Sequence, residues 1–143
     1  MRLASAVLCA IVLCVAGEAG AEVTAKNAWV RGTVKGQTAT GAFMTITSTE
    51  NAKLVGIRSA AAPMVELHAS SMDKGVMQMH AIEALDLPAG KPVELKPGGH
   101  HVMMMGLDKP LAAGARVPFT LVVESGGKRA EVPVEAEVRP LGK

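Results

Sequence analysis

Two-residue alternation of apolar and polar side chains, interrupted by turn-forming residues, most constrains the fold of this chain. The clearest example is residues 128–138, KRAEVPVEAEV, in which alanine and valine alternate with glutamate and one proline. Successive side chains of a strand point to opposite faces, so this pattern is typical of a half-buried strand. No window after residue 21 keeps apolar residues at helical spacing over three turns. The sequence therefore predicts an all-β domain.

Several further segments carry strand patterns. With the segment above, the predicted strands are residues 28–31, 41–48, 54–59, 64–69, 76–84, 92–95, 101–105, 117–124 and 129–138. Gly126 and Gly127 favour a tight hairpin, so the last two strands are expected to pair antiparallel. Pro133 predicts that the last strand lies at a sheet edge. Many short strands at this spacing favour a β-sandwich or a Greek-key barrel.

The N-terminus has the pattern of a secretory signal peptide. Arg2 precedes an apolar run from Leu3 to about Gly17, and residues 19–21, AGA, supply small residues before Glu22. We predict a signal peptide at residues 1–21 and one domain at residues 22–143. A retained membrane anchor needs about 20 apolar residues, and this run is shorter. A lipoprotein site is disfavoured because Cys9 and Cys14 each follow Val-Leu rather than small residues.

Composition excludes several classes of function. Both cysteines lie in the predicted signal peptide, which removes thiol redox chemistry and thiolate metal ligands from the mature domain. A net charge of +2, with no Tyr, two Phe and one Trp, is a poor basis for nucleic-acid binding. No catalytic triad, phosphate-binding loop or carboxylate pair stands out, so we expect a protein that is not an enzyme.

Histidine and methionine carry the remaining chemistry. In residues 64–69 the alternation places His68 with Glu66, away from the core face. Residues 71–75, SMDKG, are expected to form a turn that leads into VMQMHA, and this hairpin would bring Met79 near His68. In GGHHVMMMGL, parity places His101, Met103 and Met105 on one face. Alternate strand residues lie about 6.6 Å apart, which makes His101 and Met103 a natural chelating pair.

Other histidines and methionines have simpler interpretations. Methionine often fills gaps in a core, and we expect this role for Met44, Met64, Met104 and Met105. For His80 and His100 we expect a surface or hydrogen-bonded role. For Met72 three interpretations remain: an exposed turn residue, an auxiliary metal ligand or part of a contact surface.

Two imidazoles and two thioethers form a soft, neutral donor set. Such a set suits Cu(I) and is poor for Ca²⁺, Mg²⁺ or Zn²⁺. Nickel or Cu(II) at the histidines would leave the methionines unexplained. We therefore predict that His68, Met79, His101 and Met103 are the ligands of a Cu(I) ion.

The spacing of these residues resembles that of the periplasmic copper chaperone family PCu(A)C. The family pattern is a histidine, ten residues, a methionine, twenty-one residues and His-x-Met, which His68, Met79 and His101-Val102-Met103 match. The segments AWVR, GAFMTITSTEN, MVELHAS, GVMQMHAI and PGGHHVMMMGL also look like the family. His80 stands where many relatives carry Arg, and the chain ends in RPLGK without a His- and Met-rich tail.

The resemblance implies a single-domain, cupredoxin-like Greek-key β-sandwich in the periplasm. It further implies a Cu(I) metallochaperone that delivers copper to the dinuclear centre of cytochrome c oxidase subunit II or to another periplasmic copper protein. A copper-buffering or copper-tolerance protein without a dedicated recipient is the alternative. A secreted β-sandwich interaction module with chance His and Met residues is a third interpretation. No nucleic acid, and no membrane after signal cleavage, is expected as a partner.

Overall fold

The computed structural model describes residues 21–140, and its regular structure in that range is β-strand. The strands are β1 (Val23–Arg31), β2 (Ala39–Ser48), β3 (Ala52–Arg58), β4 (Met64–Asp73), β5 (Val76–Ile82), β6 (Leu85–Leu87), β7 (Val93–Leu95), β8 (His101–Met105), β9 (Arg116–Ser125) and β10 (Lys128–Arg139). The prediction of an all-β domain is confirmed. The predicted signal peptide lies outside the described residues, except for Ala21.

The strands form one continuous sheet that wraps around a single core. Their order is β5-β4-β8-β2-β1-β10-β9-β3-β6, and β7 pairs with β2. The pairing of β1 with β10 is parallel and joins the two halves of the molecule, whereas the other named strand pairs are antiparallel. Both halves supply buried side chains, including Ile46 and Val102 from one and Leu54, Phe119 and Leu121 from the other.

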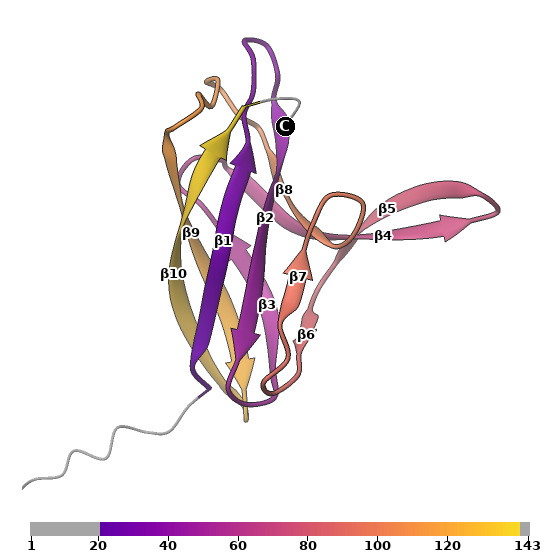
Figure 1. Cartoon of the computed structure of the whole chain (residues 1–143), viewed down its shortest axis with the longest axis vertical. Coiled ribbons are helices and arrows are strands. Elements are labelled where there is room, and N and C mark those ends of the chain that lie inside the picture. The colour runs from indigo at the N-terminus through magenta and orange to yellow at the C-terminus, as the bar shows by residue number, and fades with distance from the viewer. Residues whose placement is uncertain (1–20, 141–143) are drawn as a thin grey trace, which may run out of the picture.

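The β4–β5 hairpin projects from this body as an arm, which we define as residues 70–80 (Figure 1). Its strands remain paired out to Asp73 and Val76. Lys74 and Gly75 form the turn with φ values of 50° and 79°. Positive φ at both central residues is the signature of a type I′ hairpin, which needs only two loop residues. The prediction of a turn over residues 71–75 was therefore too long, and Met72 lies on a strand.

Two other expectations need correction. Leu85–Leu87 forms the short strand β6, which the sequence analysis did not predict. Strand β10 lies between β1 and β9, so the edge position inferred from Pro133 was wrong for the strand as a whole. The pairing with β1 covers Glu137 to Arg139, and Pro133 lies outside that stretch, opposite Thr120 of β9. At Pro133 the ladder with β1 has ended, so this part of β10 pairs with β9 and lies beyond the β1 ladder, a position in which a proline is tolerated.

The methionines divide between core and surface. Met44 and Met104 are buried, as predicted for core residues. Met64 is 51% exposed, so its expected core position was wrong. Met105 lies directly opposite Met64 on the same face of the sheet and is only half-buried. The alternation of β8 explains this difference, since Val102 and Met104 occupy its core face and Met103 and Met105 its outer face.

Within residues 21–140, no helix has the length and apolarity required to cross a membrane.

Candidate metal centre

The two candidate histidines lie side by side on neighbouring strands. His68 of β4 is directly opposite His101 of β8. Opposed residues of an antiparallel pair project to the same face, and the two ring centroids are 5.6 Å apart. The other face of these strands carries the buried Leu67 and Val102. The pair of imidazoles therefore lies on the outer face of these two strands, and the core lies against their inner face.

Both candidate methionines share that outer face. Met103 follows two residues after His101 on β8, and it lies opposite Glu66 of β4 and Gly41 of β2. Met79 of β5 lies opposite Ser70. Ser70 follows two residues after His68 on β4, so Met79 and His68 are diagonal neighbours on the same face.

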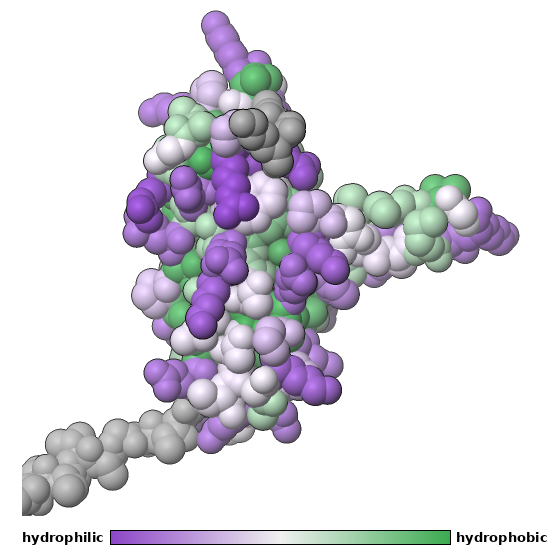
Figure 2. All heavy atoms as spheres, viewed as in Figure 1, coloured by the Kyte–Doolittle hydropathy of each residue, from purple (hydrophilic) through white to green (hydrophobic). Residues whose placement is uncertain are grey.

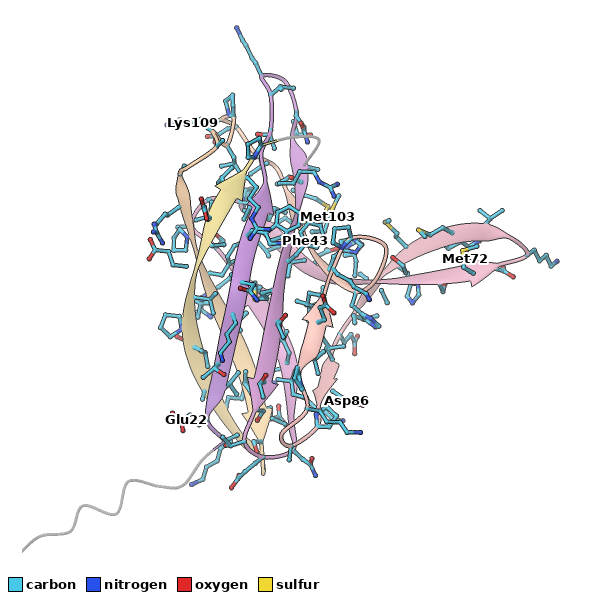
Figure 3. All side chains as sticks on the ribbon, viewed as in Figure 1. Glu22, Phe43, Met72, Asp86, Met103 and Lys109 are labelled. Atoms are coloured by element: carbon cyan, nitrogen blue, oxygen red, sulfur yellow. The ribbon has the colours of Figure 1, made fainter. Side chains whose placement is uncertain are left out.

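Three of the four predicted ligands line one surface pocket. Its lining includes Met79, His101 and Met103, together with Arg31 and Phe43. Figure 3 labels Met103 beside Phe43 on the body of the sandwich. The strand pairing and the pocket together bring the four predicted ligands to one place.

Hydrogen bonding fixes the tautomer of His101. Its Nδ1–H donates to the carbonyl oxygen of Gly99 at 3.0 Å. A carbonyl can only accept, so Nδ1 carries the proton and Nε2 keeps a free lone pair. The Ser70 hydroxyl donates to the same carbonyl at 3.1 Å. Only 6% of His101 is exposed. The ring is therefore held in one orientation with one nitrogen ready to bind a metal.

His68 has a carboxylate as its partner. Its Nε2 lies 3.0 Å from Oε2 of Glu66, and the His68 side chain is 18% exposed. A carboxylate accepts from the ring N–H, which leaves Nδ1 as the free donor atom. Carboxylate–histidine pairs of this kind orient metal ligands and raise their basicity. The period-two pattern that places Glu66 and His68 on one face contains this signal, although the sequence alone does not indicate that Glu66 supports His68.

Aromatic side chains border the site on β1 and β2. The Phe43 ring centroid is 6.4 Å from that of His101 and 4.5 Å from that of Trp29. The guanidinium groups of Arg31 and Arg139 stand over Phe43 and Trp29, at 5.5 and 4.9 Å from the ring centroids. Cation–π contacts of this kind help to hold the rings in place. The rings of Trp29 and Phe43 form an aromatic wall that shields one side of His101 from solvent.

Gly41 makes room for this wall. A Cβ atom at Gly41 would lie 2.9 Å from Cζ of Phe43, closer than side-chain packing allows. The absence of a side chain lets the ring lie across β2 toward His101. This role could not be predicted from the sequence. A glycine inside a strand indicates that another group approaches the backbone closely, but it does not identify that group.

The two other histidines and Met72 lie in different places. His80 is opposite Ala69, on the face of the arm that the four ligands do not share. His100 precedes β8 and is exposed. Met72 is directly opposite Met77 near the tip of the arm. Within residues 21–140, no group of three or more His, Cys, Asp or Glu side chains is placed to hold a metal ion. The donors gathered on the outer face are instead imidazoles and thioethers.

A match to a protein-family model decides the family. The model described as "Putative lipoprotein LpqE-like" matches residues 23–138. The chain belongs to the LpqE-like family. A relative in Leifsonia xyli subsp. xyli, described as "Putative lipoprotein Lxx21020", is 36% identical over 115 residues. That match covers 79% of this LpqE-like chain and 69% of the relative.

Several solved structures resemble this LpqE-like domain. The copper-bound PCuAC domain from PmoF2 has a TM-score of 0.66 and 26% identity, covering 82% of this chain and 92% of that one. Apo-DR1885 from Deinococcus radiodurans has a TM-score of 0.61 and 30% identity, covering 87% and 86%. The Cu(I) form of DR1885 has a TM-score of 0.59 and 31% identity, covering 79% and 75%. These neighbours confirm the predicted cupredoxin-like β-sandwich.

Proposed function

We propose that this protein is a Cu(I) metallochaperone of the bacterial periplasm that binds one copper ion through His68, Met79, His101 and Met103. The observation that carries the proposal is the convergence of two imidazoles and two thioethers on one outer face. Soft, neutral donors of this kind prefer Cu(I) to harder ions. Similarity to a copper-bound PCuAC domain and to a Cu(I)-bound DR1885 structure supports the same choice of ion.

The surroundings of the ligands fit a carrier that gives up its ion. His101 is buried and hydrogen-bonded, whereas Met79 is 57% exposed on the arm. A recipient can therefore reach the ion from the exposed side of the arm and begin to bind it before all of the bonds to this protein have broken. All four protein ligands are neutral, so transfer by ligand exchange requires no proton or electron to move. The protein acts without a catalytic step of its own.

The place of action and the recipient are also part of the proposal. Residues 1–21 act as a signal peptide, and residues 22–143 are the exported copper-binding domain. The lipoprotein description of the family supports export to the cell envelope. The recipient is the dinuclear copper centre of cytochrome c oxidase subunit II or another periplasmic copper protein. A copper-buffering role at the same site is the alternative, and a deletion strain that loses oxidase copper mainly under copper scarcity would favour the chaperone.

Anaerobic Cu(I) titration against a competing chelator tests the binding site. The purified protein should bind one ion tightly. Met79→Leu and His101→Ala should each weaken that binding by more than about 100-fold, since removing a ligand costs more than disturbing its support. His80→Ala is the matched control on the opposite face of the arm and should bind as the unaltered protein does. Unchanged affinity in both ligand variants would refute the assignment.

A further inference from the structure

The arm carries more methionine than the proposed copper site uses. Met72 lies directly opposite Met77, and Met79 lies two residues farther along β5. By strand parity the three thioethers occupy the same face as His68. The arm therefore presents a row of sulfur atoms that runs from its tip to the candidate metal centre.

Packing does not account for these residues. Met72, Met77 and Met79 are 67%, 50% and 57% exposed, so they fill no gap in a core. Figure 2 shows apolar residues along the arm, away from the body of the sandwich. The opposite face of the same stretch carries no methionine; its residues are Ser71, Asp73, Val76, Gln78 and His80. The opposite face also exposes an apolar side chain, Val76, but no sulfur, so the thioethers are confined to the face that leads to the candidate metal centre.

The register puts the three sulfurs within reach of one ion. Directly opposed residues have Cβ atoms about 4.5–5.5 Å apart, and diagonal neighbours are about 7–8 Å apart. Methionine has three rotatable bonds beyond Cα, so side chains from these positions can converge above the sheet. Three neutral thioethers without an imidazole form a soft site for a monovalent ion such as Cu(I) or Ag(I).

We propose that Met72, Met77 and Met79 form a second, weaker Cu(I) site through which the ion enters and leaves the main site. The proposal rests on the proposed function, because Met79 belongs to both ligand sets. An ion moves inward when its bonds to the sulfurs of Met72 and Met77 break and bonds to His68, His101 and Met103 form. Met79 remains bound throughout. The ion stays monovalent, and no proton is transferred.

Methionine methyl NMR with Ag(I) as the probe tests this second site in the purified protein. The first equivalent of Ag(I) should shift the methyl signals of Met79 and Met103. Further Ag(I) should shift those of Met72 and Met77 and shift that of Met79 a second time, because its thioether is shared by both sites, while Met64, exposed on the same face beyond the main site, should not move. A response of Met79 and Met103 alone, even at several equivalents, would overturn the second site and leave the proposed function standing. No response from any of these methyls would overturn both.

A double variant tests the route. Met72→Leu with Met77→Leu keeps the exposed surface apolar, and it should bind one ion with the affinity of the unaltered protein. Loss of Cu(I) to a competing chelator should be several-fold slower, because the intermediate position is absent. Met64→Leu is the matched control and should release Cu(I) at the rate of the unaltered protein. An unchanged release rate in the double variant would contradict the route.

Discussion

His101 and Met79 reach the same site from contrasting surroundings. His101 is almost fully buried, and the Gly99 carbonyl fixes its ring. Met79 is more than half exposed on a hairpin that leaves the body of the protein. At the scale of single residues, the site therefore combines a rigidly held imidazole, that of His101, with a thioether, that of Met79, which has many rotamers. Rigidity favours tight binding, and the mobile ligand favours exchange.

Glu66 should act as a positioning residue for His68. Glu66→Gln retains the size of the side chain but replaces the carboxylate with an amide, which is a weaker partner for the ring N–H. Cu(I) affinity should fall about tenfold, as for other outer-shell changes at metal sites. Chelator competition measures this, and Glu94→Gln, on the exposed part of β7, is the control. Equal affinity in Glu66→Gln and the unaltered protein would show that the hydrogen bond between Glu66 and His68 is incidental.

Gly41 should be intolerant of even one added carbon atom. Gly41→Ala places a Cβ against the Phe43 ring, and overpacking of this kind typically costs about 1–3 kcal/mol in unfolding free energy. Gly56→Ala is the matched control in β3, where the nearest atom to an added Cβ is 3.6 Å away. Urea unfolding should separate the two variants. If both unfold at the same urea concentration, the ring is free to move aside.

At the scale of elements, the arm depends on its two-residue turn. Gly75→Val puts a β-branched residue at a φ of 79°, which costs about 1–2 kcal/mol. Amide hydrogen exchange over residues 70–80 should then accelerate about 5- to 30-fold, while the body is unaffected. Lys74→Asn is the control, because Asn-Gly is a preferred type I′ pair. Acceleration that extends into β9 and β10 would contradict an independently fraying arm.

The strands could be predicted from the sequence wherever one face of the strand is buried and the other is exposed to solvent. Strand β8 was predicted with its observed limits, because its period of two is unbroken and PGG stops the chain before it. The arm was predicted too short because polar Ser71 and Asp73 read as turn residues, whereas pairing with β5 keeps them extended. Strand β6 has only three residues, too few for a period to emerge.

The candidate site could be predicted only in part, because the sequence does not give the order of the strands in the sheet. Parity places His68 and Met103 on outer faces, but it does not say which strands are neighbours. The order β5-β4-β8-β2 brings the four predicted ligands together. The wall of Phe43 and Trp29 depends on the same order, and no spacing along the chain indicates it.

At the scale of the whole molecule, β8 links the core to the site. Its inner face contributes Val102 and Met104 to the core, and its outer face contributes His101 and Met103 to the proposed metal centre. An ion that binds the folded state alone stabilises that state by mass action, by about 2.7 kcal/mol at a free concentration one hundred times Kd. For a domain of this size, that corresponds to a rise in Tm of roughly 10 °C.

Two variants on this strand should separate stability from binding. His101→Ala should abolish most of the Cu(I)-induced rise in Tm, because a ligand is lost. Met104→Ala removes a fully buried side chain and should lower the unfolding free energy by about 2–5 kcal/mol. It should nevertheless retain the Cu(I)-induced rise, since the outer face is untouched. Calorimetry of both variants with and without Cu(I) measures the difference. If Met104→Ala loses the rise as well, the two faces of β8 are coupled, and the site depends on the packing of the core beneath it.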